Sequence, residues 1–285
     1  MGHCGTTLFC RGLFQMAPAL YKAPAPKGNP AAEMTLDYDC GERNRRMAVT
    51  LSVVVPVKDE AENVAPLARE IATAVAGYES EIIFVDDGSA DGTPERLVAL
   101  KAELPNLRVI CHAANRGQSR AVRTGVRAAR GALIVTLDGD GQNDPADIPK
   151  LLAKFETAND RLGLVGGVRA RRKDTASRRL ASPIANAVRQ SLLHDGAADS
   201  GCGLKAFRRE AFLALPYFDH LHRFLITMMI REGYGVAFVD VNHRPRLHGK
   251  SKYTNWRRML VGIDDLMGVR WLQRRMRGNT EAKEL

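Results

Sequence analysis

Residues Leu51–Val57 read LSVVVPV, an apolar run in which valine is the commonest residue. Such an uninterrupted run is typical of a strand that is buried on both faces of a parallel sheet. Apolar positions at helical spacing follow between Ala61 and Ala76, and a second apolar run occupies Glu81–Val85. This alternation predicts an α/β fold: a Rossmann-like, mostly parallel sheet with helices on both faces.

The alternation continues along the chain and becomes less regular after about residue 160. We expect further helices at Thr93–Leu104, Ser119–Ala129 and Ser177–Leu193, and further strands at Leu107–Cys111, Ala132–Leu137 and Leu162–Val168. The pattern predicts one domain, over residues 47–254, whose second half extends the sheet.

The charge of the chain favours anionic partners, because 42 Lys and Arg against 32 Asp and Glu give a net charge of +10. No helix-turn-helix, zinc-finger or RNP pattern accompanies this charge, so we do not expect nucleic acid as a partner. No window reaches the roughly 18 consecutive apolar residues that a membrane-spanning helix requires. The five cysteines form neither a disulfide framework nor a zinc pattern. We expect a cytoplasmic protein.

Residues 1–46 differ in composition from the rest of the chain. They contain no run with helical or strand periodicity, and Pro, Ala, Lys and Gly crowd the stretch Ala17–Pro30. We expect a flexible N-terminal tail outside the domain. A true start of the protein at Met47 would explain the same composition equally well.

Two carboxylates follow directly after the expected strand at Ala132–Leu137, in the turn Asp138-Gly139-Asp140-Gly141-Gln142. Glycine lets the backbone bend sharply and lets a ligand approach. Hard oxygen ligands in this position suit Mg²⁺ or Mn²⁺ that bridges a diphosphate. Solvated acids in a turn would give the same triplet, so the position of the triplet in the sheet has to distinguish a metal site from a solvated turn.

A second acidic turn, Asp86-Asp87-Gly88-Ser89, ends another strand of the same sheet. Ligands of parallel sheets bind beyond the carboxyl ends of the strands, so we expect both turns to face one crevice. Asp87 could accept hydrogen bonds from a nucleobase or a ribose. The alternative is a helix N-cap, a task that Asp91 or Thr93 can perform.

Several short motifs follow one another in chain order. They are Val55–Glu60, Val85–Ser89, Asn115–Gly117, Ala121–Gly125, Leu137–Gln142 with Pro145, His222–Phe224, Arg244–Arg246 and Gly249–Tyr253. With these motifs, the chain from about Leu51 to Tyr253 resembles inverting family 2 glycosyltransferases of GT-A fold. Within that family it resembles the polyprenyl-phosphate branch, which is similar to dolichol-phosphate mannose synthase.

The resemblance implies roles for individual residues. The residues implied to bind the nucleotide are Pro56, Glu60, Asp87 and Gln142. The residues implied to bind the metal and the diphosphate are Asp138, Asp140 and Gln142. Those implied for the acceptor phosphate are Arg169, Arg178, Ser182 and Arg246. We expect Asp138, Asp140 and Arg178 to be catalytic. The chain departs from the family pattern at Lys58, where many relatives have an aromatic residue, and at Gly139, where alanine is commoner.

The resemblance implies metal-dependent transfer of a sugar, with inversion, from a UDP- or GDP-linked donor to an undecaprenyl or dolichyl phosphate. A lipid phosphate is already anionic near neutral pH, so its activation needs no general base. The first alternative is a family 2 enzyme with a soluble or cell-envelope sugar acceptor, for which Asp199 is the available base. A non-catalytic nucleotide-binding module is the second, and the intact acidic turns argue against it. A dehydrogenase would need a G-x-G-x-x-G, which does not follow the first strand.

The C-terminal segment, residues 255–285, predicts an amphipathic basic helix and tail. Its apolar positions at helical spacing are Trp256, Leu260, Ile263, Met267 and Trp271, and its arginines are Arg257, Arg258, Arg270, Arg274, Arg275 and Arg277. Such a helix can lie in a membrane interface. We expect a peripheral protein at the cytoplasmic membrane face, held there by this helix or by a membrane-anchored partner. Asp264 and Asp265 interrupt the basic surface, so packing on the protein core remains open.

Overall fold

The computed structural model describes residues 50–159, 161–169, 189–197, 199–246 and 255–275, and in the last range side chains from residue 262 onward. All of these residues lie in one compact unit, Glu42–Leu285. The tail expected at residues 1–46 lies outside the described ranges, so the boundary at residue 47 stays a prediction.

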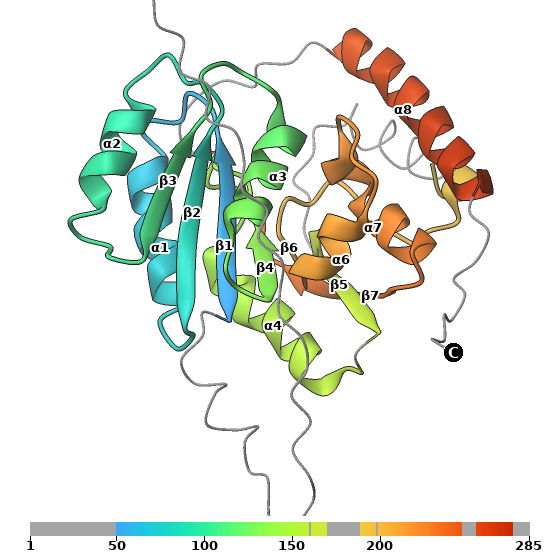
Figure 1. The fold of residues 1–285 in the computed structure, drawn as a ribbon, viewed down its shortest axis with the longest axis horizontal. Helices are drawn as coiled ribbons and strands as arrows, with labels where there is room; N and C mark the ends of the chain where they lie inside the picture. The colour runs from blue at the N-terminus through green and yellow to red at the C-terminus, as the bar shows by residue number, and fades with distance from the viewer. Residues whose placement is uncertain (1–49, 160, 170–188, 198, 247–254, 276–285) are drawn as a thin grey trace, which may run out of the picture. The chain divides into compact units, whose positions relative to one another are not determined.

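Seven strands form one mixed sheet in the order β3-β2-β1-β4-β6-β5-β7 (Figure 1). The strands are β1 Leu51–Val57, β2 Ser80–Asp86, β3 Leu107–Cys111, β4 Leu133–Thr136, β5 Leu162–Arg169, β6 Lys205–Arg208 and β7 Gly235–Val241. The first four pair in parallel, as do β5 and β7, whereas β6 runs antiparallel to both of its neighbours. The predicted α/β class with a mostly parallel sheet is confirmed.

Helices cover both faces of this sheet (Figure 1). The helices on one face are α1 Val64–Ala74, α2 Thr93–Leu100 and α4 Ile148–Thr157, the last preceded by a 3₁₀ turn, η2 Pro145–Asp147. Those on the other face are α3 Gln118–Ala128, α6 Arg209–Ala214, α7 Leu221–Arg231 and α8 Asn255–Arg275. None of the helices in the described ranges combines the length and the apolar character needed to cross a lipid bilayer.

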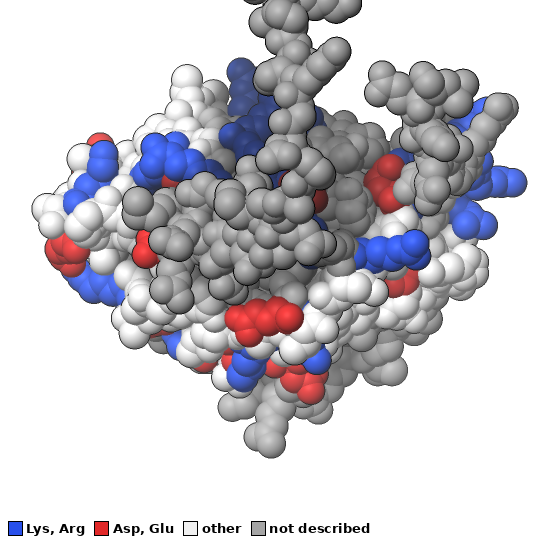
Figure 2. Space-filling model, turned by 60° about the horizontal axis from the view of Figure 1, so that its bottom comes forward, with Lys and Arg blue, Asp and Glu red and all other residues white. Residues whose placement is uncertain are grey.

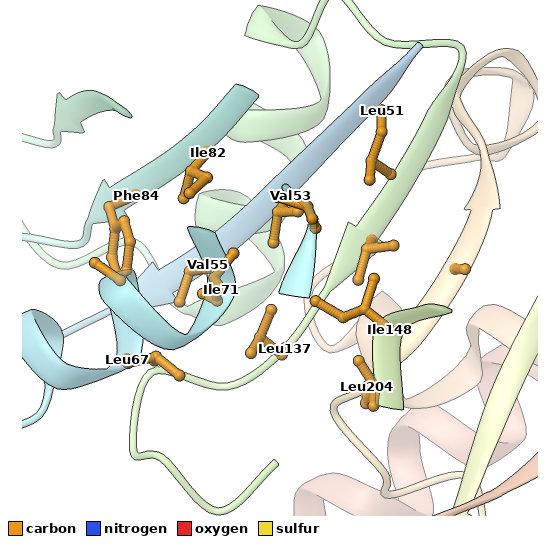
Figure 3. Close-up of a cluster of buried hydrophobic side chains, with 14 of the residues drawn as sticks. Leu51, Val53, Val55, Leu67, Ile71, Ile82, Phe84, Leu137, Ile148 and Leu204 are labelled. Atoms are coloured by element: carbon orange, nitrogen blue, oxygen red, sulfur yellow. The ribbon is translucent and has the colours of Figure 1, made fainter. Parts of the chain in front are cut away.

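The core explains why β1 reads as a continuous apolar run. All seven residues of β1 are buried, and Val53 and Val55 point to one face while Val54 points to the other. Figure 3 shows the first face, where these valines lie beside Leu67 and Ile71 of α1. Burial of each such side chain stabilises the fold by about 1.5–3 kcal/mol.

The second half of the chain differs most from the sequence expectation. The strands β6 and β7 and the helices α4, α6 and α7 were not predicted. β6 and α6 are short, β7 is mostly half-exposed, and most of α7 is buried. The helix expected at Ser177–Leu193 lies mostly outside the described residues, although residues 189–193 are helical. The helix expected at Thr93–Leu104 ends earlier, at Leu100, and a C-terminal helix is present at Asn255–Arg275.

Candidate active site

The two acidic turns lie at the same edge of the sheet. β1 lies between β2 and β4, and all three run in parallel, so their carboxyl ends point the same way. The start of α3 connects the two turns: the Gly117 amide donates to Asp87 Oδ2 at 2.7 Å, and Gln118 Nε2 donates to Asp138 Oδ1 at 2.7 Å. The start of α3 therefore bridges the two turns.

Asp87 is a buried carboxylate that orders the loop before α3. Its Oδ1 accepts the Arg116 amide at 2.8 Å and lies 2.8 Å from His112 Nδ1, while Oδ2 accepts the Gly117 amide. Gly88 follows with a φ of +69°, and a side chain there would meet the backbone of Ala114 at 2.8 Å. A carboxylate accepts about four hydrogen bonds, so three of these positions are taken within the protein.

Asp138 and Asp140 occupy the turn after β4, and both are half-buried. Asp140 Oδ1 accepts the Gln142 amide at 3.1 Å, and Asn143 Oδ1 accepts the Asp138 amide at 3.1 Å, which fixes the turn. Burial and the neighbouring charge of Asp140 raise the pKa of Asp138. A divalent cation between the two carboxylates would relieve both effects.

The residues present fit a metal that is shared with a ligand. Among the described residues, no three His, Cys, Asp or Glu side chains converge on one point. Mg²⁺ in nucleotide enzymes is usually held by one or two carboxylates together with phosphate oxygens and water. The backbone of Gly203 packs directly on the Asp138 carboxylate, where any side chain would overlap it. Glycine at position 203 therefore keeps this carboxylate unobstructed.

A cavity of about 340 Å³ adjoins Asp138 and reaches Pro56 at the end of β1. Its polar lining comes mainly from Gln118, Ser119, Asp138, Arg189, Lys205, His222 and Arg223. Ser119 Oγ lies 2.7 Å from His222 Nδ1 and accepts the His222 amide at 3.2 Å, so α3 and α7 are joined beside the cavity. Basic side chains outnumber acidic ones around this space, which suits an anionic group.

Lys205 is a site residue that the sequence reasoning missed. It is the first residue of β6, is only 5% exposed, and its Nζ donates to the carbonyl oxygen of Cys202. Burial lowers the pKa of Lys205, and the nearby Asp138 partly opposes this effect. A lysine in the otherwise apolar run Gly203–Phe207 was the available signal, because lysine is almost never fully buried without a partner.

Glu60 and Arg246 form an ion pair, although the resemblance implied a nucleotide role for one and an acceptor role for the other. Arg246 Nη2 donates to Glu60 Oε1, and Asn63 Nδ2 donates to Glu60 Oε2 at 2.6 Å. Thr93 Oγ1 accepts the Glu60 amide at 2.9 Å. Lys58, which stands at the family's aromatic position, donates to the Gly88 carbonyl at 3.0 Å.

The proposed acceptor residues are described only in part. Arg169 makes a forked pair with Asp199, with Nε to Oδ2 at 2.6 Å and Nη2 to Oδ1 at 2.7 Å. Arg178 and Ser182 lie outside the described residues, so their roles stay predictions. The forked pair fixes the Arg169 guanidinium near the cavity wall and engages both oxygens of Asp199.

Residues 242–246 hold the turn Asp138–Gln142 from the outside. The Arg244 amide donates to the Gln142 carbonyl at 2.9 Å, and Asn143 pairs with His243 in a β-bridge. The Arg244 guanidinium donates to Glu70 of α1 and to Asp144, both at 2.6 Å. These contacts connect α1, the turn and the segment after β7.

Comparison with known proteins identifies the family. Residues 52–215 match the model described as glycosyl transferase family 2. This chain belongs to glycosyltransferase family 2. It is 34% identical over 251 residues to dodecaprenyl-phosphate galacturonate synthase of Rhizobium johnstonii, across 85% of this chain and 72% of that one. It is 36% identical over 208 residues to undecaprenyl-phosphate 4-deoxy-4-formamido-L-arabinose transferase of Enterobacter sp. (strain 638), across 72% of this chain.

The same match spans 62% of the length of the Enterobacter protein. Both of these family 2 relatives are polyprenyl-phosphate sugar transferases by name, which confirms the predicted resemblance. Among solved structures, glucosyl-3-phosphoglycerate synthase from Mycobacterium tuberculosis, in complex with Mn²⁺, UDP and glucosyl-3-phosphoglycerate, gives a TM-score of 0.61. That match has 18% identity and covers 79% of each chain, so it confirms the GT-A fold.

Proposed function

We propose that this glycosyltransferase transfers a sugar, with inversion, from a nucleoside-diphosphate sugar to a polyprenyl phosphate, and that Asp138 and Asp140 hold the Mg²⁺ or Mn²⁺ it uses. The observation that carries the proposal is the Asp138 carboxylate, which lines a cavity with a mainly basic lining and has Asp140 beside it in the same turn. The names of the two relatives support the same acceptor class.

The residues around the turn position the donor. The bond from Gln118 holds Asp138, and the Gln142 amide holds Asp140, so both carboxylates keep a fixed orientation. A bound divalent cation would neutralise the diphosphate and make it a better leaving group. Pro56 lies at the cavity wall next to Asp138, and Glu60 stands at the entrance of α1, where we expect the nucleotide.

The acceptor chemistry requires positive charge more than a base. An oxygen of the lipid phosphate forms a bond to the anomeric carbon while the bond from that carbon to the diphosphate oxygen breaks. The leaving nucleoside diphosphate takes the electron pair, and no proton has to be removed from the acceptor. Lys205, His222 and Arg223 line the cavity at which this phosphate would arrive. Arginine can donate forked hydrogen bonds to a phosphate, and we propose this role for Arg178.

A soluble hydroxyl acceptor is the second candidate, and it needs a carboxylate base. Asp199 was the available residue, but both of its oxygens accept hydrogen bonds from Arg169. A carboxylate that is paired in this way is a poor base, because the adjacent guanidinium favours its charged form. This pairing favours the lipid phosphate over the soluble acceptor.

The test is a panel of UDP- and GDP-sugars, each radiolabelled in the sugar, with polyprenyl phosphate and Mn²⁺ and the full chain. We expect at least one donor to give label that extracts into organic solvent, and no such label when polyprenyl alcohol replaces the phosphate. Label that instead appears on water-soluble sugar acceptors would overturn the proposal. The same panel identifies the sugar and the base.

A further inference from the structure

Three arginines form a stripe along the outer side of α3. Arg120, Arg123 and Arg127 are spaced by three and four residues, so they share one face of the helix, while Ala121, Val122 and Val126 are buried on the other. Like charges at these spacings destabilise a helix. An anion beside the stripe would offset this repulsion.

The described part of the protein does not supply that anion. In the described ranges, none of these three arginines forms an ion pair with a carboxylate. Burial and the charges of Arg127 and Arg120 lower the pKa of Arg123. The stripe also takes no part in the proposed transfer, because it lies outside the cavity lining.

Tyr217 holds two of these guanidinium groups in place. The Arg120 and Arg123 guanidinium carbons lie 4.3 Å and 4.6 Å from the centre of its ring. The Tyr217 hydroxyl donates to Asp219 at 2.9 Å, which fixes the ring. Two like charges are therefore held side by side on a platform, a geometry suited to closely spaced phosphates.

The loop after α6 links this stripe to α8, on the same face of the sheet. Tyr217 contacts α3, and three residues later His220 Nδ1 lies 2.9 Å from Asp265 Oδ2 of α8. α8 packs inward through the buried Val269, and Gln273 Nε2 donates to the Leu193 carbonyl at 2.9 Å. Residues 217–220 thus contact both the arginine stripe of α3 and α8.

The outward side of α8 carries an apolar ridge with arginines beside it and one exposed carboxylate, Asp264. Five large hydrophobic side chains in the described ranges are exposed, and three of them, Ile263 at 51%, Met267 at 59% and Trp271 at 57%, follow one another at intervals of four on α8. Arg270, Arg274 and Arg275 lie around Trp271, with the Arg275 guanidinium 5.6 Å from its ring centre. In Figure 2, blue side chains gather at the right-hand edge, the side on which Figure 1 shows α8.

We infer that the face made by α3, residues 217–220 and α8 docks on the anionic surface of a lipid bilayer. Ile263, Met267 and Trp271 enter the boundary of the acyl chains, and the arginines of both helices lie among the lipid phosphates. An apolar ridge with arginine flanks is the pattern of an interfacial helix. The inference rests on the proposed function, because a lipid acceptor has to be reached at such a surface.

The test is flotation of the full chain with vesicles of phosphatidylcholine, with and without phosphatidylglycerol. We expect flotation only with the anionic vesicles. The variant Arg120→Gln/Arg123→Gln/Arg127→Gln should bind them about 100-fold more weakly, from roughly a fivefold loss per arginine near an anionic surface. The control Arg69→Gln/Lys101→Gln/Lys154→Gln removes the same charge from exposed positions on the opposite face and should change binding by less than about threefold.

The apolar ridge has its own variant, Met267→Ser/Trp271→Ser, with Val98→Ser on α2 as the control. We expect Met267→Ser/Trp271→Ser to lose flotation and Val98→Ser to float like the wild type. The melting temperature should be unchanged in both variants. If the α3 triple variant and the control triple variant lost vesicle binding equally, the inference would be overturned, because net charge alone would then explain binding. The inference would also be overturned if every variant floated like the wild type. Absence of flotation for all proteins, the wild type included, would overturn it as well.

Transfer to a short-chain prenyl phosphate in detergent separates this inference from the proposed function. The variant Arg120→Gln/Arg123→Gln/Arg127→Gln should retain that activity although it no longer binds the anionic vesicles. Absent transfer together with the expected flotation pattern would refute the proposed function and leave the docking surface standing.

Discussion

At the scale of single residues, Asp87 follows β2 and Asp138 follows β4 at the same edge of the sheet, but the two carboxylates have different surroundings. Asp87 is 4% exposed and accepts hydrogen bonds from the Arg116 and Gly117 amides. Asp138 accepts one from Gln118, and burial raises its pKa. A carboxylate that is satisfied by backbone amides stabilises the fold, whereas one that is short of donors is ready for a cation.

This difference predicts separate effects for substitutions in the two turns. Asp140→Asn should reduce transfer by about 100-fold or more and leave the melting temperature unchanged, because it removes a proposed metal ligand. Asp87→Asn should destabilise the protein by about 1–3 kcal/mol, since its amide would face backbone donors. Transfer assays and thermal melting measure both, with the exposed Asp240→Asn as the control. Full activity of Asp140→Asn would rule out its role.

For Lys205 we predict a substitution that lowers activity without lowering stability. Lys205→Met keeps a long apolar stem in β6 and removes a buried ammonium whose hydrogen-bond partner is the Cys202 carbonyl. We expect unchanged or higher stability, because desolvation of the buried ammonium is costly, and we expect transfer to be about 10- to 100-fold slower. The exposed Lys154→Met should change neither. Transfer at the wild-type rate by Lys205→Met would show that the cavity does not use this charge.

At the scale of elements, Arg244 ties the turn Asp138–Gln142 and the following Asp144 to Glu70 of α1. Burial opposes the charged form, but these two carboxylates raise the pKa of Arg244. Arg244→Met should loosen the turn and weaken metal-dependent binding of UDP or GDP by about tenfold. Calorimetry measures the binding, and hydrogen exchange of residues 138–144 should become faster.

The matched control is Arg69→Met, which breaks the pair between Arg69 and Glu103 at the other side of α1. It should leave both measurements unchanged. If Arg244→Met binds nucleotide like the wild type, residues 242–246 do not position the turn.

The elements that the sequence predicted well are those whose pattern is local. β1 and β2 are buried on both faces, so their residues form continuous apolar runs. β6 has only four residues and β7 is mostly half-exposed, so neither shows a distinct period. The acidic turns were found because they directly follow the predictable strands.

Long-range pairs explain what the sequence could not predict about the site. Arg169 and Asp199 are 30 residues apart, and Glu60 and Arg246 are 186 apart. No local spacing indicates that these side chains meet. The burial of Lys205 likewise depends on β6 lying between β4 and β5, a strand order that the motifs do not contain.

At the scale of the whole molecule, Glu81 joins three segments at the end of the sheet opposite the site. Its oxygens accept hydrogen bonds from Ser52 Oγ at 2.7 Å, the Arg130 amide at 2.6 Å and Arg108 Nη1 at 2.6 Å. Burial alone would raise the pKa of Glu81, but these hydrogen bonds outweigh it and lower the pKa. Glu81 of β2 therefore connects β1, β3 and the residues before β4.

Because the folded-state pKa of Glu81 is lowered, its contribution to stability is present above the unfolded-state pKa of about 4.3. That contribution is lost as the pH falls through the folded-state pKa. Glu81→Gln should lower the free energy of unfolding by about 1–3 kcal/mol at pH 7 and by less in acid. Urea titrations between neutral and acidic pH measure this, with the exposed Glu95→Gln as the control. A difference from wild type that stays constant with pH would contradict the role of the charge.

The measurement that most directly tests the proposed transfer is the balance of its products. The full chain is incubated with its donor, polyprenyl phosphate and Mn²⁺, and both the released nucleoside diphosphate and the sugar extracted with the lipid are quantified. We predict one nucleoside diphosphate released for each sugar joined to the lipid phosphate. Both products should disappear when either the lipid phosphate or the divalent cation is omitted. Nucleoside diphosphate released at the same rate without lipid phosphate, with the sugar left in water, would contradict the proposed transfer.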